Sequence, residues 1–145
     1  MTGWLLDTNI LSAFAPGKPA IGPRIAGWFN ERSDELFLSA ITAAEIEAGI
    51  SKVRRTGSGR KANELRDWFE RMLSFYADRV LPFDLAAARI AGVLGDAALA
   101  GGQHPGFADV AIAAIAKSRE LVIVTLNLRH FDPLGIDTLN PFNPA

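Results

Sequence analysis

The stretch WLLDTNIL, residues 4–11, places an aspartate at the end of a short apolar run. Residues 4–6 carry no alternating polar positions, which is typical of a strand buried on both faces in a parallel sheet. Asp7 follows this strand directly, and apolar residues resume after Asn9. The pattern predicts a strand that carries a carboxylate at its carboxyl end, followed by a short helix over residues 9–15.

Further apolar runs alternate along the chain with segments of helical periodicity. The expected strands cover residues 36–38, 80–83, 121–125 and a short edge strand within 135–141. The expected helices cover residues 20–32 (interrupted or started at Pro23), 39–53, 60–77, 85–100 and 107–117. This alternation predicts an α/β fold of three layers: a central parallel sheet of four to five strands with helices on both faces. We expect a single domain over residues 1–145, with the first and fourth strands in the interior of the sheet.

The bulk composition narrows the class of protein. The chain has 145 residues, 49% of them hydrophobic, which is enough for one sizeable core. Cysteine is absent, so disulfides and thiolate metal sites are excluded. No leader pattern or apolar run of about 18 residues is present, so we expect a cytoplasmic protein without a membrane partner. The net charge of −1 means that any affinity for nucleic acid must come from local features.

In open parallel sheets, functional sites lie beyond the carboxyl ends of the strands. This rule points to Asp7, Ser39, Asp84 and Thr125. Asp84 has no second acid nearby and heads a clear helix, so we interpret it as a helix cap. Asp7 has the same alternative, because an aspartate before a helix can accept the free amide protons of the first turn.

Glu45 is the candidate acid of the third expected helix. It follows Thr42 by three residues, the T-x-x-E spacing of a capping box, so a purely structural role is an open alternative. Glu47 cannot face the same way as Glu45, because two residues turn a helix by roughly 200°.

Asp109 opens a helix that is apolar nearly all round. No lysine or arginine lies within the ten residues before it, and a buried carboxylate normally has a cation as partner. A metal ion is therefore a candidate partner, while stabilisation by the helix dipole is the alternative.

The sequence TLN, residues 125–127, follows the fourth strand. The Thr125 hydroxyl and the Asn127 amide can bind a hard cation or orient a bound water, although ordinary turn chemistry is the alternative. His104 and His130 lack the i, i+4 partner of a zinc-binding helix, so we interpret both as structural or surface residues.

Three carboxylates at one edge of the sheet would repel one another, and some would stay protonated without a compensating cation. Mg²⁺ or Mn²⁺ would solve this problem, because both ions prefer oxygen ligands and keep several waters. An ion held in this way can bind a phosphate oxygen and activate water. The predicted chemistry is attack of water on a phosphodiester.

Four motifs together resemble the PIN-domain ribonucleases and, more narrowly, the VapC-type toxins of toxin–antitoxin pairs. These motifs span the chain in order: LLDTNIL (5–11), SAITAAEIEAGI (39–50), FADVAIAAIA (107–116) and IVTLNLRHFDPLGIDTLNP (123–141). The resemblance implies an endoribonuclease that depends on Mg²⁺ or Mn²⁺. The family's metal-binding and catalytic acids match Asp7, Glu45 and Asp109.

We expect supporting roles for Thr8, Asn9, Thr125 and Asn127. A fourth acid of many members is Asn127 here, and His130 stands where an aspartate is frequent. These departures favour one bound ion over two.

The family further implies an RNA substrate, a homodimer, and a hetero-oligomer with a small VapB-like antitoxin whose tail blocks the acidic cleft. Four aromatic residues of the early helices are candidate contact surfaces, with an ordinary core role as the alternative. They are Trp28, Phe29, Trp68 and Phe69.

Two other classes of protein fit the sequence less well, and a third alternative has the same fold without the activity. A haloacid-type phosphatase needs a second aspartate where Asn9 stands, and a receiver domain needs a lysine after its late strand. A non-catalytic RNA-binding or regulatory PIN-fold module is the remaining alternative. The basic segment RRTGSGRK, residues 54–61, is either an RNA contact or a solvated loop between helices.

Overall fold

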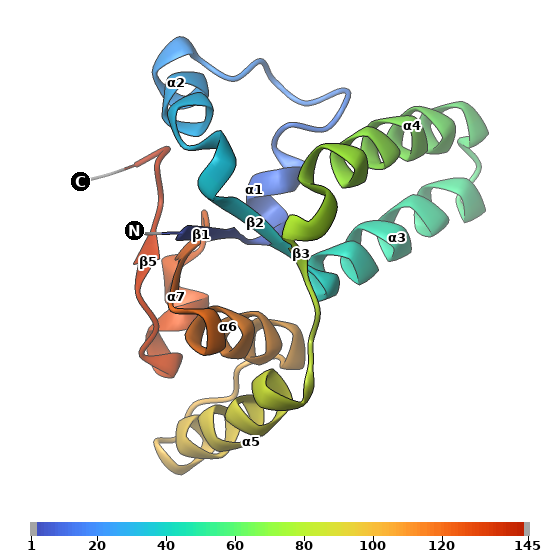
Figure 1. Cartoon of the computed structure of the whole chain (residues 1–145). Coiled ribbons are helices and arrows are strands. Elements are labelled where there is room, and N and C mark those ends of the chain that lie inside the picture. Colours follow the sequence, from blue (N-terminus) through green and yellow to red (C-terminus); the bar gives the residue numbers. More distant parts are fainter. Residues whose placement is uncertain (1–2, 144–145) are drawn as a thin grey trace.

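A parallel sheet forms the centre of the computed structural model, which describes residues 3–143 (Figure 1). Within these residues the sheet has five strands in the order β3-β2-β1-β4-β5, and every neighbouring pair is parallel. The strands are β1 (Gly3–Leu6), β2 (Leu36–Ser39), β3 (Val80–Leu81), β4 (Leu121–Val124) and β5 (Thr138–Leu139). The predicted α/β fold is confirmed, with β1 in the middle, β4 beside it and the short β5 at an edge.

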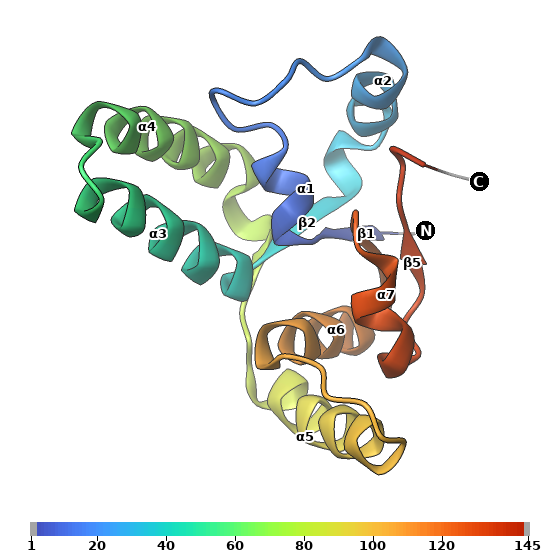
Figure 2. The same ribbon diagram turned by 180° about the vertical axis from the view of Figure 1, so that it is seen from behind.

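Helices cover both faces of this sheet, as Figures 1 and 2 show. They are α1 (Thr8–Ser12), α2 (Pro23–Glu31), α3 (Ala40–Arg55), α4 (Gly59–Tyr76), α5 (Leu85–Ala100), α6 (Phe107–Arg119) and α7 (Leu128–Phe131). Leu6 belongs to a core cluster with α1 to α4, whereas its neighbour Leu5 belongs to a second cluster with α5 to α7. Successive strand residues point to opposite faces, so β1 supplies both cores and holds the three layers together.

Prolines explain where the observed elements differ from the expected ones. The second helix begins at Pro23, whose fixed φ angle suits the first helical position. The third strand stops at Leu81 instead of Phe83, because Pro82 has no N–H to donate to a neighbouring strand. The first helix ends at Ser12, before the turn that leads to Pro16.

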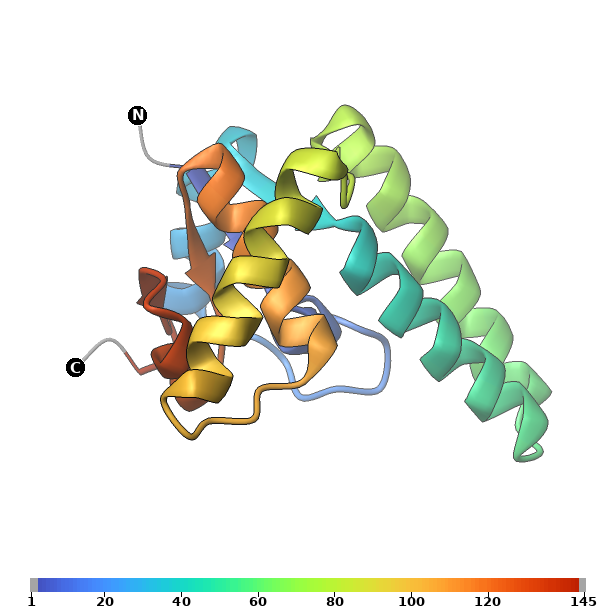
Figure 3. The same cartoon turned by 90° about the horizontal axis from the view of Figure 1, so that it is seen from below.

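Helices α3 and α4 form an antiparallel hairpin that extends away from the sheet (Figure 3). The basic segment 54–61 lies at its tip, where residues 56–58 connect the two helices. Three of the four aromatic residues considered as contact surfaces are core residues, because Phe29, Trp68 and Phe69 are buried. The contact-surface alternative is therefore wrong for these three. Trp28 is half-buried and packs edge-on against Trp4 with ring centroids 5.2 Å apart.

Among the helices of residues 3–143, none combines the length and the apolar character that crossing a bilayer requires.

Candidate active site

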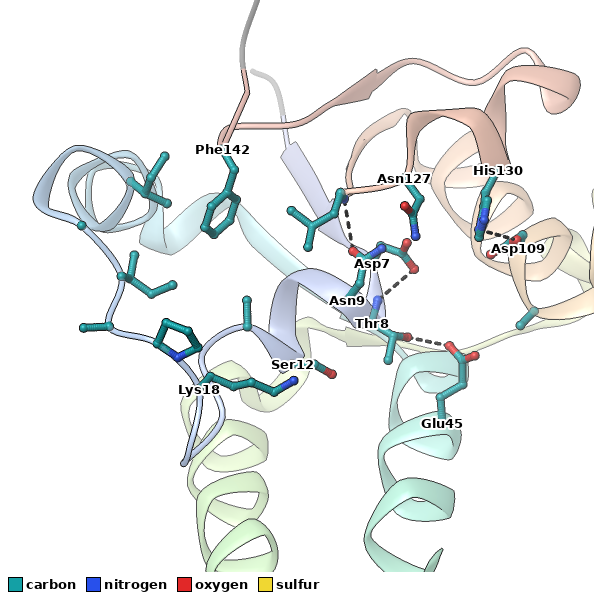
Figure 4. Close-up of a pocket in the computed structure, with 18 of the residues that line it drawn as sticks. Asp7, Thr8, Asn9, Ser12, Lys18, Glu45, Asp109, Asn127, His130 and Phe142 are labelled. Carbon is teal, nitrogen blue, oxygen red and sulfur yellow. Dashed lines mark hydrogen bonds and ion pairs between the residues drawn. The ribbon is translucent and has the colours of Figure 1, made fainter. Parts of the chain in front are cut away.

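A cavity of about 910 Å³ opens at the carboxyl ends of the central strands. We call it the acidic pocket, because Asp7, Glu45 and Asp109 all line it (Figure 4). They come from three separate elements: the end of β1, the first half of α3 and the first turn of α6. The other predicted residues on its lining are Thr8, Asn9 and Asn127, while Ser12, Lys18, His130 and Phe142 also contribute.

Asp7 lies at the base of the pocket, with only 6% of its surface exposed. Its Oδ1 accepts a hydrogen bond of 2.8 Å from the backbone N–H of Thr8, so it does cap α1. Its Oδ2 accepts a second bond of 2.8 Å from the hydroxyl of Thr125. Capping is thus only part of its role, because the carboxylate also links the ends of β1 and β4 by a hydrogen bond and lines the pocket.

Thr125 organises the segment that follows β4. It is fully buried, and its hydroxyl oxygen accepts a bond of 3.0 Å from the backbone N–H of Asn127. The Asn9 side-chain amide reaches the same oxygen at 3.4 Å, while its carbonyl oxygen accepts a bond of 3.2 Å from the N–H of Leu126. Thr125, Asn9 and Asn127 therefore share one network with Asp7. This network fixes the orientation of the Asp7 carboxylate.

A chain of hydroxyl groups holds Glu45 at the side of the pocket. The Thr8 hydroxyl donates to Glu45 Oε1 at 2.6 Å and lies 2.9 Å from the hydroxyl of Thr42. Because the single hydroxyl proton of Thr8 is used on Glu45, Thr42 must be the donor to Thr8. Ser39 donates in turn to Thr42 at 3.3 Å. The buried hydroxyls of Ser39 and Thr42 thus orient Thr8, which in turn orients the exposed carboxylate of Glu45.

The capping-box interpretation of Glu45 is wrong. The cap of α3 is Ser39, whose side chain accepts a bond of 3.0 Å from the N–H of Thr42. Glu47 points elsewhere, as the helix geometry predicts. It forms an ion pair with Arg66 of α4, and the hydrogen bond from Arg66 lowers the pKa of Glu47.

Asp109 has a partner that the sequence did not indicate. Nδ1 of His130 lies 3.3 Å from Asp109 Oδ2, and Figure 4 shows the two side chains facing each other at one side of the pocket. His130 and His104 are both exposed, as expected of surface residues, but His130 also lines the acidic pocket. The available signal was the position of His130 three residues after Asn127, on the segment that returns to the pocket from β4.

Burial raises the pKa of both Asp7 and Asp109 above the usual aspartate range. For Asp7, the bonds from Thr125 and Thr8 oppose this shift, while the negative charges of Asp109 and Glu45 add to it. For Asp109, the charge of His130 opposes the shift and that of Glu45 adds to it. The negative charges of the three carboxylates therefore repel one another across the pocket.

The side chains that line the pocket suit a hard divalent cation, because such an ion prefers oxygen ligands. The pocket offers carboxylate oxygens, with amide and hydroxyl oxygens around them. Among residues 3–143, no three side chains of His, Cys, Asp or Glu are drawn together as a ready-made metal site. Glu45 is held by Thr8, and Asp109 by His130.

Comparisons with known proteins agree with this arrangement. A family model described as PIN domain matches residues 4–134. The chain is 34% identical to VapC ribonuclease Y4jK of Sinorhizobium fredii, covering 97% of this chain and 99% of the relative. It is 33% identical to toxin FitB of Neisseria gonorrhoeae, covering 96% and 98%.

Solved structures give the same result. The structure of FitAcB from Neisseria gonorrhoeae matches with a TM-score of 0.84 and 32% identity, covering 97% of this chain and 99% of that one. The structure of DNA-bound VapBC from Salmonella typhimurium matches with a TM-score of 0.80 and 30% identity, covering 97% and 99%.

Proposed function

The chain belongs to the PIN-domain family of VapC-type toxins, and on this premise we propose that it is an endoribonuclease that uses Mg²⁺ or Mn²⁺ in the acidic pocket. The observation that carries the proposal is the meeting of Asp7, Glu45 and Asp109 in one cavity at the carboxyl edge of a parallel sheet. These residues are far apart in the sequence, and each belongs to a motif of the family. A purely structural origin does not explain why three acids share one pocket.

We assign the metal-binding and catalytic roles to these three carboxylates. When bound there, the cation would neutralise their mutual repulsion, hold a phosphate oxygen and lower the pKa of a water. Asp7 supplies a fixed oxygen, because both of its oxygens are held by Thr8 and Thr125. One ion rather than two is favoured, since Asn127 and His130 replace further acids at the pocket.

The protein's own groups can position the attacking water. Within residues 3–143, Oε2 of Glu45 forms no hydrogen bond, so it can accept a proton from a water in the pocket. The water oxygen forms a bond to phosphorus as the bond from phosphorus to the leaving sugar oxygen breaks. That oxygen takes a proton from solvent, and Glu45 releases its proton to solvent. Asn127 and the hydroxyls of Thr8 and Thr125 support the arrangement by hydrogen bonds.

The partners follow from the same premise. We propose that a small VapB-like antitoxin covers the acidic pocket and that the toxin forms a homodimer within a toxin–antitoxin hetero-oligomer. We propose the cytoplasm as the site of action, because its RNA substrate is there. Residues 1–145 are proposed to act as a single PIN domain.

Metal-titrated cleavage of RNA tests the activity. Purified wild-type protein is incubated with RNA in chelator and then with increasing Mn²⁺ or Mg²⁺, with Asp7→Asn as the inactive variant. Asp84→Asn is the matched control, because Asp84 also caps a helix after a strand but lies outside the pocket. Asparagine caps helices as well as aspartate does, so both variants should fold.

We expect metal-dependent cleavage by the wild type and by Asp84→Asn, and none by Asp7→Asn. Expression of the wild type alone should arrest growth, and co-expression of the neighbouring antitoxin gene should relieve the arrest. If the wild type cleaves no more RNA than Asp7→Asn at any metal concentration, the protein is instead a non-catalytic RNA-binding or regulatory module.

A further inference from the structure

A second cavity of about 300 Å³ continues from the acidic pocket along the inner side of the α3–α4 hairpin. We call it the side cleft. It shares Thr8, Ser12, Lys18 and Glu45 with the acidic pocket, so the two cavities meet at the Glu45 carboxylate. From there the side cleft follows α3 as far as Val53, a distance of about 12 Å at the helical rise of 1.5 Å per residue. That length fits several nucleotides of a single strand.

Two lysines give the side cleft a positive charge. Lys18 projects from the loop after α1, and Figure 4 shows it extending toward Ser12. Lys61 reaches the cleft from the first turn of α4, at the end of the basic segment 54–61. Both residues are exposed, and neither forms an ion pair within residues 3–143.

Among the acids of the hairpin, Glu45 is the one that lines the side cleft, whereas Glu47, Glu64 and Glu70 pair with arginines. Glu64 pairs with Arg60 at 3.5 Å, and Arg66 pairs with Glu47 and, at 3.6 Å, with Glu70. A chain with a net charge of −1 thus presents a local excess of positive charge beside its acidic pocket.

The floor of the side cleft contains a glycine that the fold does not require. Gly49 lies in the middle of α3, where glycine is the weakest helix former apart from proline. A Cβ atom at this position would meet nothing within 4 Å, so no packing contact inside the chain excludes a side chain. Its effect is to leave the cleft open next to Glu45, where a ligand backbone can approach closely.

We propose that the side cleft binds the sugar–phosphate backbone of the RNA on one side of the cleaved bond, with Lys18 and Lys61 contacting phosphates and Gly49 providing room. The proposal rests on the proposed ribonuclease function and adds a direction to it: the strand leaves the acidic pocket along α3 toward the basic tip of the hairpin. The two lysines suit phosphates, and the apolar side chains between them, which include Ile50, Leu65 and Trp68, suit the sugars and bases of a single strand.

Binding of a fluorescently labelled single-stranded RNA oligonucleotide tests this path. The Asp7→Asn background prevents cleavage, and fluorescence anisotropy is measured at several salt concentrations. Lys18→Ala and Lys61→Ala should each weaken binding by about threefold or more and reduce the slope of log K against log salt by about 0.7, the value for one phosphate contact to a single strand. Lys117→Ala is the matched control, because this exposed lysine lies on α6 at the opposite side of the molecule.

The variant Gly49→Ala tests whether Gly49 keeps the cleft open for RNA or is needed for the stability of the fold. Alanine should leave the thermal midpoint unchanged or raise it, while KM for RNA rises by about threefold or more in the active protein. Gly92→Ala of α5 is the control, since its Cβ also meets nothing within 4 Å. If the lysine variants keep the wild-type affinity and salt slope, the proposal is overturned even when the wild type cleaves RNA. Lost binding of the antitoxin in those same variants would then assign the cleft to the protein partner.

Discussion

The floor of the acidic pocket and its walls are built in different ways. The floor consists of Asp7 and Thr125, which are buried and directly follow the adjacent strands β1 and β4. The walls, Glu45 on α3 and Asp109 with His130, are exposed or half-buried and each acid has one side-chain partner. The fold thus buries one carboxylate between two strand ends and leaves two nearer to solvent, each held by a single side chain. We therefore expect substitution of the buried carboxylate to have the larger effect.

The largest expected difference is between Asp7→Asn and Glu45→Gln. We expect Asp7→Asn to lower kcat/KM by more than about 100-fold, the upper end of the range for residues that only orient ligands. Glu45→Gln should be the milder change by about tenfold, because water can replace this exposed carboxylate both as a ligand and as the acceptor of the proton. Single-turnover cleavage at saturating Mn²⁺ measures both variants. Equal losses in the two variants would show that floor and walls do not differ.

Thr125→Val tests whether the floor is fixed by its hydroxyl. The change removes the donor to Asp7 and the acceptor of the Asn127 N–H, so buried polar groups lose their partners. We expect a loss of about 1–3 kcal/mol in the free energy of unfolding and about 10–100-fold in activity. Urea denaturation and cleavage rates provide the two measurements. Thr125→Ser, which keeps the hydroxyl, should recover most of both, and its failure to do so would indicate a packing defect instead.

Thr8→Val makes the corresponding change in a wall. It removes the donor to Glu45 and leaves the carboxylate free to rotate. We expect about 1 kcal/mol of destabilisation, since Thr8 is only half-buried, and about a tenfold rise in the Mn²⁺ concentration needed for half-maximal cleavage. Thr8→Ser is the control that retains the hydroxyl. An unchanged metal requirement in the valine variant would mean that Thr8 does not position Glu45.

The smallest expected effect concerns pH in the absence of metal. The raised pKa of Asp7 means that the folded state holds its proton more tightly than the unfolded state does. This contribution to stability is complete below the ordinary value of 3.8 and is lost as pH rises through the folded pKa. The thermal midpoint of Asp7→Asn minus that of the wild type, measured in chelator, should therefore increase as the pH rises from 3 to 7. A constant difference between the two proteins across this range would contradict the shift.

Much of the fold could be predicted because its signals are local. The apolar run before Asp7 and the alternation of strands with helices define a parallel sheet, and Pro23 and Asp84 mark helix starts by their own chemistry. The position of Asp7 at a strand end and of Asp109 at the start of an apolar helix made them candidates, whereas the choice of Glu45 over Glu47 depended on the resemblance to the family. The length of β3 was overestimated, since the effect of Pro82 depends on the hydrogen bonding of a sheet whose order was not yet known.

What could not be predicted depends on contacts between distant residues. The pairing of His130 with Asp109 requires the segment after β4 to approach α6, and the short spacing from Asn127 to His130 places His130 near the pocket without identifying Asp109 as its partner. The support of Glu45 by Thr8 and Thr42 joins two motifs that are separated by more than thirty residues. The interior location of Phe29, Trp68 and Phe69 was equally undetermined, because aromatic residues at helical spacing can face a core or a partner.

The central position of β1 has a consequence for the synthesis of this protein. Asp7 leaves the ribosome early, but its backbone N–H pairs with Val124 and its carboxylate with Thr125, which are translated much later. A nascent chain that has not reached these residues also has no β4 to hold β1 in place, and parallel pairing of such distant segments is intrinsically slow. A growing chain therefore cannot assemble the acidic pocket until almost all of its messenger RNA has been translated.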